Sequence, residues 1–298
     1  MSHPLLDSIQ GLFQDPPPQH VFEVSSQCLA YVRPENPQDV QYREFHPGTV
    51  TVSPLKDNVT DPLAFTQAIE SLVSGLPPAK KPRSAAVILP DFAARLQVLD
   101  FDTFPGNFEE QQALVRFRMK KTIPFDIESA AVSFYQQPSS SSKRVEVVVA
   151  SMSLEITGRY EAPFRACGFH PGLVTTSAMA AMNLLPMTGL NVTAKLSGNA
   201  LTVIVTDGPG LRLVRCVELE QGSVDEMMAV IHPTLVYVED ELKRHAEKLL
   251  LCGFGADTAR LATEWQQEFG IPAEGLQSKF GAPTRWNAGI LGYLQGAK

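Results

Sequence analysis

Long apolar runs are missing from this sequence. No stretch approaches the roughly 18 to 20 consecutive apolar residues that a helix needs to cross a bilayer. The first residues also lack the basic start and long apolar stretch of a secretory signal peptide. Both absences argue against a membrane-spanning or secreted protein, so we expect the chain to work in the cytoplasm.

Cysteine and basic residues are also scarce. The 4 cysteines among 298 residues lie far apart, with no Cys-x-x-Cys pair and no histidine at ligand spacing. This argues against a disulfide framework and against a metal site. Lysine and arginine number 25 against 32 aspartates and glutamates, which gives a formal net charge of -7. Nucleic-acid binders usually carry a clustered basic face, so we expect no nucleic-acid partner.

The length of 298 residues and the apolar fraction of 44% predict a globular protein with two domains or two lobes. Two successive blocks, the second starting near Thr188, share one order: a strand meander, then alternating helices and strands. The sequence therefore predicts an α/β protein of duplicated architecture. Strands are expected at 21–33, 39–45, 49–53, 84–90, 94–104, 130–137, 143–151, 170–176, 190–196, 200–208 and 211–219. Helices are expected near 5–13 and at 61–76, 107–121, 153–169, 177–185, 223–242 and 285–296, a polar hairpin tip at 138–143, and a strand, glycine turn, helix and short strand within 245–274.

Helix 107–121 has the charge order that suits a helix dipole. Asn107 is a suitable N-cap, acidic residues occupy the first turn, and basic residues gather toward the last. Pro124 is expected to end the helix. The basic cluster is either a charged helix end or a contact for anionic lipid or an acidic neighbour, and the sequence leaves both interpretations open. Its members are Arg116, Arg118, Lys120 and Lys121.

Three segments carry a resemblance to a known family. They are SAAVILPDFAARLQVLDFDTFP (84–105), LVRFRMKKTIPFDIESAAVSFY (114–135) and VVVASMSLEITGRYEAPFRACGF (147–169). They resemble the middle of PilM-type proteins, the cytoplasmic actin-like components of type IV pilus assembly. The most specific part is a helix rich in lysine and arginine, followed by IPFDIE and an aromatic strand. The likeness extends more weakly from about Val21 to Leu294.

The resemblance implies an α/β, two-lobed actin-like (ribonuclease H-like) ATPase fold, shared with actin, sugar kinases and the cell-division protein FtsA, with a nucleotide cleft between the lobes. The first lobe would comprise residues 1–187, with a small inserted subdomain at about 91–150. The second lobe would comprise residues 188–298, and its C-terminal helix (285–298) would be placed to pack back on the first lobe.

The resemblance also implies a partner. PilM-type proteins bind a short cytoplasmic N-terminal peptide of the inner-membrane protein PilN. We therefore expect a PilN-like partner, contact with other inner-membrane pilus components, and peripheral association with the inner-membrane face through the partner. The resemblance leaves room for a homo-oligomer. Candidate peptide contacts lie at the rim of the inserted subdomain: Phe101, Phe104, Arg116, Lys120, Ile123, Pro124 and Phe125.

The segment MNLLP, at 182–186, is similar to the short peptide by which PilN-type partners dock. It lies at the end of an expected helix. We interpret it as part of the fold, with Leu184 and Leu185 in the core.

The first phosphate-binding hairpin of the family reads Asp-x-Gly-Ser, with a lysine a few residues later. Laid onto residues 21–33, these positions are Glu23, Ser25, Ser26 and Ala30. Only the serine is unchanged. Ser25 places a Cβ where bare backbone should approach a phosphate, and Ala30 removes the cation that would offset phosphate charge.

The second hairpin and the adenine turn also depart from the family pattern. Lys195 stands at or near the usual acidic position, which binds magnesium through carboxylate oxygen, and a single glycine, Gly198, remains. The adenine turn normally has two adjacent glycines, whereas here Phe254 separates Gly253 from Gly255. This ring would either stack on adenine or fill the vacant pocket, and we favour filling.

Departures in three loops favour a non-catalytic scaffold with no cofactor, in which ATP with magnesium is expected only if the degenerate site still binds. Two alternatives stay open at this point. One is an active ATPase or small-molecule kinase of the actin-like superfamily. The other is a GspL-like cytoplasmic domain of type II secretion.

Overall fold

The computed structural model describes residues 17–137 and 144–297. The helix expected near 5–13 and the hairpin tip expected at 138–143 lie outside these ranges. Among the described residues, no helix is both long and apolar enough to span a membrane.

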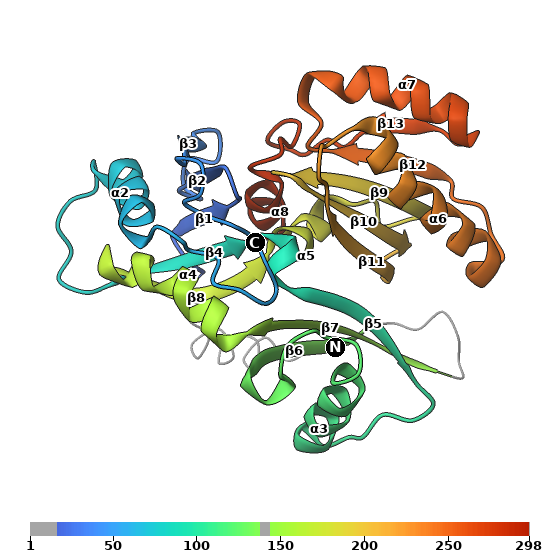
Figure 1. Cartoon of the computed structure of the whole chain (residues 1–298), viewed down its shortest axis with the longest axis horizontal. Helices are drawn as coiled ribbons and strands as arrows, with labels where there is room; N and C mark the ends of the chain where they lie inside the picture. Colours follow the sequence, from blue (N-terminus) through green and yellow to red (C-terminus); the bar gives the residue numbers. More distant parts are fainter. Residues whose placement is uncertain (1–16, 138–143, 298) are drawn as a thin grey trace, which may run out of the picture.

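The first lobe is built on a five-stranded sheet (Figure 1). Its meander is formed by β1 (His20–Val24), β2 (Cys28–Val32) and β3 (Gln41–Glu44), and the parallel strands β4 (Arg83–Leu89) and β8 (Phe169–Thr176) extend it. The strand order is β3-β2-β1-β4-β8, which leaves β8 at one edge. Helices α2 (Pro62–Val73) and α4 (Leu154–Ala166) cover one face through an aromatic core that includes Phe22, Phe65 and Phe164.

The second lobe repeats this plan. Its meander is formed by β9 (Leu190–Ser197), β10 (Ala200–Asp207) and β11 (Gly210–Glu218), and β12 (Lys248–Cys252) and β13 (Ala273–Gly275) follow in parallel. The order β11-β10-β9-β12-β13 is that of the first sheet, position for position. Helix α6 (Val224–Leu242), which starts with a Ser223–Glu226 capping box, and helix α7 (Thr258–Phe269) cover its core.

A small subdomain is inserted between β4 and β8, and we call it the insert. Its antiparallel sheet has the order β5-β7-β6, with β5 (Arg95–Phe101), β6 (Ala130–Gln137) and β7 (Val145–Ser153). One face is covered by α3 (Phe108–Met119). The other face, with Leu96 and Val148, packs on Leu211 and Ile204 of the second lobe. Figure 1 shows the insert below both lobes, with α3 outermost.

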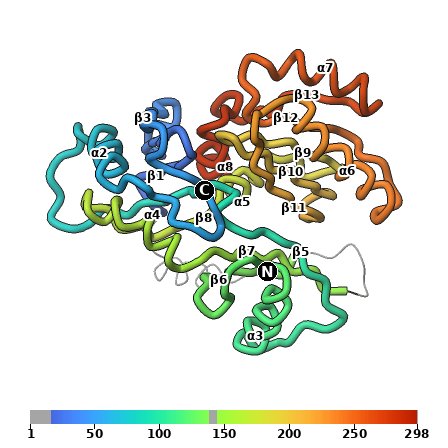
Figure 2. The backbone as a smooth tube through the Cα atoms, viewed as in Figure 1, coloured from blue at the N-terminus to red at the C-terminus, as the bar shows by residue number. Residues whose placement is uncertain are grey.

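Two helices connect the lobes. Figure 2 follows the chain from the first lobe through α5 (Ser177–Ala181) and the short 3-10 turn at Met182–Leu184 into the second, and back through α8 (Ala288–Gly296). Helix α8 packs on β1, β2 and β4 of the first lobe through Ile290 and Leu294. It crosses α5 so closely that a Cβ at Gly292 would collide with the backbone of Ala180 and Ala181. Leu184 and Leu185 are buried here, as expected for core residues.

Two sequence expectations were wrong. Residues 49–53 form no strand, because the chain turns at Pro54 and makes only a single bridge between Val50 and Val59. Helix α3 ends at Met119 rather than near Pro124. Both the amide and the hydroxyl of Thr122 bond to the Met119 carbonyl and turn the chain out of the helix first.

Candidate functional site

The first hairpin of the cleft, between β1 and β2, is closed by its own serine. The Ser25 hydroxyl accepts hydrogen bonds from the amides of Cys28 (2.9 Å) and Gln27 (3.3 Å), and Ser25 is buried. These two amides of the turn are therefore bonded to a side chain of the same turn.

The second hairpin, between β9 and β10, touches the first. Gly198 has a φ of +58°, in the left-handed region, and a Cβ built on it would lie 2.7 Å from Ser26 Oγ. Asn199 Oδ1 lies 3.4 Å from the same hydroxyl, as the acceptor of a weak hydrogen bond. The tips of the two hairpins are therefore in direct contact.

Lys195, near the end of β9, lies inside the protein. Its side chain is 1% exposed and its Nζ is 2.8 Å from Asp91 Oδ2. Asp91 also accepts hydrogen bonds from the Thr202 hydroxyl (2.9 Å) and from the Ala178 amide (2.6 Å). Burial disfavours the charged form of Lys195, but Asp91 and Glu23 outweigh burial and raise the pKa of Lys195. The ion pair joins β9 of the second lobe to the loop after β4 of the first.

Glu23 is the second buried carboxylate of this region. It accepts hydrogen bonds from the Ser177 hydroxyl and from the amides of Gly289 (3.1 Å) and Ile290 (2.8 Å) at the start of α8. Burial raises the pKa of Glu23, against the opposing effects of Lys195 and of these hydrogen bonds. Glu23 thus fixes the first turns of both connecting helices.

At the adenine turn, Gly253 has a φ of +89° and packs against the Leu196 carbonyl and Arg285 so closely that no side chain fits. The Phe254 ring is buried in the core of the second lobe, perpendicular to Trp265 at 5.4 Å. Gly255, with a φ of +58°, begins the short turn that leads into α7.

Nucleotide with magnesium would need free amides and carboxylate oxygen in this cleft. The amides described above bond to Ser25, and the Asp91 carboxylate binds Lys195. Nor does any group of three potential metal ligands occur among residues 17–137 and 144–297. The amides of Gln27 and Cys28 and the Asp91 carboxylate are therefore already engaged within the protein.

The expected peptide contacts of the insert are divided between two environments. Phe101 is in the insert's own core, and Phe104, Ile123 and Phe125 pack against it. Arg116 donates hydrogen bonds to the carbonyls of Ile127 (2.5 Å) and Ala130 (3.2 Å). Lys120 and Pro124 are exposed. The structure therefore brings most of these residues together as a core rather than as an open surface.

A mainly apolar groove of about 600 Å³ lies between the insert and the first lobe, lined by residues of β6, β7 and β8. One wall is β6 and the other is β8, and in the described part of the chain each is an edge strand of its sheet. Met152 and Met179 line it, and such flexible side chains adapt to varied ligands. The Ser151 hydroxyl, also in the lining, is buried and has no hydrogen-bond partner among the residues that the structure describes.

Sequence reasoning missed the β8 side of this groove. The groove forms where strands separated by some 40 residues approach in space, and no local pattern encodes that approach. Leu173, on the β8 wall, is 38% exposed, but that exposure is visible only in the structure.

Comparison with solved structures supports one fold. A chain of the PilM–PilN type IV pilus biogenesis complex matches with a TM-score of 0.70 and 18% identity, covering 95% of this chain and 100% of that one. The cytoplasmic domain of EpsL, an inner-membrane component of the Vibrio cholerae type II secretion system, gives 0.49 at 16% identity over 78% and 80% of the two chains. A Bacteroides thetaiotaomicron protein of actin-like ATPase fold and unknown function gives 0.49 at 12% over 87% and 91%. The two scores of 0.49 are too low to carry an argument.

No protein-family model and no curated protein matched the chain. An identity of 18% supports a shared fold and nothing finer. The duplicated strand order, the facing hairpins and the two connecting helices agree with that likeness. The chain therefore has the two-lobed actin-like fold, and within that fold it is similar over 95% of its length to a chain of the PilM–PilN complex.

Proposed function

We propose that this chain is a non-catalytic scaffold of type IV pilus or related secretion machinery. It binds an extended N-terminal cytoplasmic peptide of a PilN-like inner-membrane protein in the groove between β6 and β8. The observation that carries the proposal is the groove itself: among the described residues, β6 and β8 are edge strands on either side of a mainly apolar lining.

Two properties of the groove suit an extended peptide. Edge strands have backbone amides and carbonyls that are free to pair with an added strand, while pockets between them accept apolar side chains. Polar residues, among them Ser133, Thr157 and Thr175, line the groove beside its apolar residues. Their hydroxyls can form hydrogen bonds with polar groups of a peptide.

Contacts between the two hairpins and across the lobes support a function without nucleotide. Ser26 contacts the second hairpin, and Lys195 forms a buried ion pair with Asp91, so these polar groups bond to one another. The two lobes are joined by side chains of the protein, so nucleotide is not needed to bridge them. In the proposed role the chain lies at the cytoplasmic face of the inner membrane, held there by its partner.

The test is calorimetry with the N-terminal cytoplasmic peptide of the PilN-like protein encoded in the same genome. We expect the wild-type chain to bind it, and Leu173→Asp to weaken binding at least tenfold, because a carboxylate on the groove wall would lose hydration on binding. Leu63→Asp is the matched control. Leu63, in α2, is 69% exposed and lies outside the groove, so its replacement should leave binding unchanged.

A parallel titration with ATP and magnesium should give no binding heat. Nucleotide binding without peptide binding would overturn the scaffold proposal in favour of the ATPase. Equal losses of peptide affinity in Leu173→Asp and Leu63→Asp would place the peptide elsewhere on the surface.

A further inference from the structure

The side chain of Gln137 connects the insert to the second lobe by hydrogen bonds to the backbone of β11. Gln137, the last residue of β6, is 3% exposed. Its Nε2 donates to the Leu211 carbonyl (2.6 Å), and its Oε1 accepts from the Leu211 amide (2.9 Å). The carboxamide therefore makes with β11 the two hydrogen bonds that a neighbouring strand would make.

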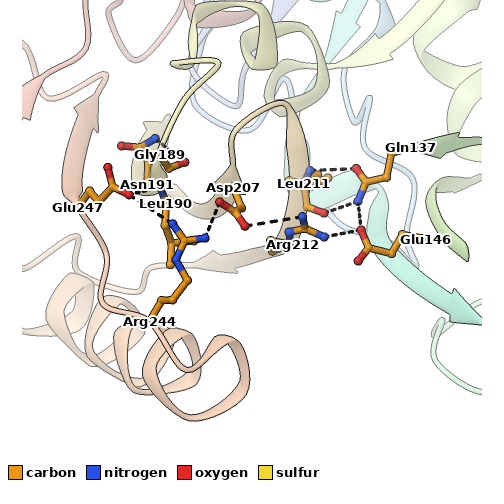
Figure 3. Close-up of polar contacts among 10 residues, drawn as sticks. All are labelled: Gln137, Glu146, Gly189, Leu190, Asn191, Asp207, Leu211, Arg212, Arg244 and Glu247. Carbon is orange, nitrogen blue, oxygen red and sulfur yellow. Dashed lines mark hydrogen bonds and ion pairs between the residues drawn. The ribbon is translucent and has the colours of Figure 1, made fainter. Parts of the chain in front are cut away.

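An ion pair stands beside these hydrogen bonds. Arg212 donates to Glu146 Oε2, and the two side chains are only 9% and 12% exposed. Gln137 Nε2 also donates to the same Glu146 oxygen, at 2.9 Å. Gln137, Glu146 and Arg212 thus form one connected unit, shown in Figure 3, which we call the clasp.

The clasp is anchored within the second lobe. Asp207, at the turn between β10 and β11, lies 3.8 Å from Arg212 and 2.8 Å from Arg244. Arg244 follows α6 and also lies 3.4 Å from Glu247, so the turn is tied to the body of the lobe (Figure 3). Ion pairs therefore connect the clasp, through Asp207, to the body of the second lobe.

The position of the clasp relates it to the groove. β6 carries Gln137 of the clasp at its end and forms one groove wall along its middle. The other wall, β8, belongs to the first lobe. We propose that Gln137, Glu146 and Arg212 are positioning residues for the peptide groove. By bonding the end of β6 to the second lobe they set the distance between β6 and β8, and they do not touch the peptide. This rests on the proposed function.

Apolar packing of Leu96 and Val148 on Leu211 docks the insert independently of the clasp. Loss of the clasp should therefore loosen the end of β6 and leave the insert folded. The variant Gln137→Leu removes the hydrogen bonds at similar volume. Its control is Gln136→Leu, at the exposed neighbouring position of the same strand.

The first measurement is hydrogen exchange of the full chain without peptide. In Gln137→Leu, we expect exchange at residues 130–137 and at the start of β11 to be roughly tenfold faster, the factor that about 1.4 kcal/mol of lost bonding produces. Gln136→Leu should match the wild type. The second measurement is peptide affinity, which should fall roughly fivefold or more in Gln137→Leu. Arg212→Met should weaken it as well, and Arg212→Lys, which keeps the charge, less so.

The outcomes separate the two proposals. Equal exchange in both glutamine variants would overturn the clasp, and so would faster exchange with unchanged peptide affinity. If the wild-type chain binds no peptide, the proposed function fails, and the exchange measurement still decides whether the clasp holds β6.

Discussion

At the residue scale, Lys195 forms a buried ion pair that joins the two lobes. An ammonium that is 1% exposed needs a carboxylate beside it, and Asp91 provides one at 2.8 Å from the other lobe. The substitution at the acidic position was evident in the sequence. The ion pair was not, because nothing in the sequence shows that residues 91 and 195 meet.

Lys195→Met should destabilise the chain by about 3 to 5 kcal/mol, because it leaves Asp91 buried and unpaired. Lys248→Met removes the exposed ion pair between Lys248 on β12 and Glu274 on β13, and it should lower the free energy of unfolding by less than about 1 kcal/mol. Urea unfolding measures both. Adding Asp91→Asn to Lys195→Met should recover part of the loss, and equal costs for the two lysine variants would contradict this account.

His20 gives the stability a defined pH dependence. Burial, followed by the positive charges of Arg33 and Arg83, lowers the pKa of His20 from 6.5 to about 4, and its Nδ1 lies 2.9 Å from the Tyr31 hydroxyl. The unfolded chain therefore binds the proton more readily. Stability is fully present above pH 6.5 and declines as pH falls toward 4, by about 2 to 3 kcal/mol.

Urea unfolding at several pH values tests this dependence. His20→Gln should flatten the decline between pH 6.5 and 4, while His46→Gln, at an exposed position, should keep it. A decline of the same size in both variants would assign it to other groups.

At the element scale, local patterns predicted most helices and strands correctly. Asn107 caps α3 as expected, by accepting a hydrogen bond from the amide of Glu109, and Asp61 caps α2 in the same way through the amide of Ala64. Wrong or displaced ends arose where a turn outcompeted the pattern, at Pro54 and at Thr122. The packing of elements on one another depends on distant residues, and the sequence showed it only through resemblance.

A glycine-to-alanine substitution should have opposite effects on stability at the crossing of α5 and α8 and at an open position of α4. Gly292→Ala should destabilise the chain by about 2 kcal/mol, because the new methyl group collides with α5. Gly158→Ala, in α4 with open space around it, should stabilise by about 0.5 to 1 kcal/mol, because alanine favours helix. Thermal unfolding of both variants gives the signs. A stabilising Gly292→Ala would show that the helices do not pack this closely.

At the scale of the whole molecule, the duplicated plan was predictable because each half of the sequence repeats the same order of elements. The two sheets confirm that plan strand by strand. The groove was not predictable from either half. Its walls come from the insert and the first lobe, and the clasp at the end of one wall joins the insert to Arg212 of the second lobe.

The return of α8 to the first lobe has a consequence for biosynthesis. Glu23 receives its two amide partners from residues 266 and 267 positions later in the chain. At roughly 5 to 20 residues per second, a ribosome needs on the order of 13 to 50 seconds to reach them. The lobe that is translated first is therefore the last to be completed, and its nascent sheet stays uncovered on the α8 side while the other lobe is being made.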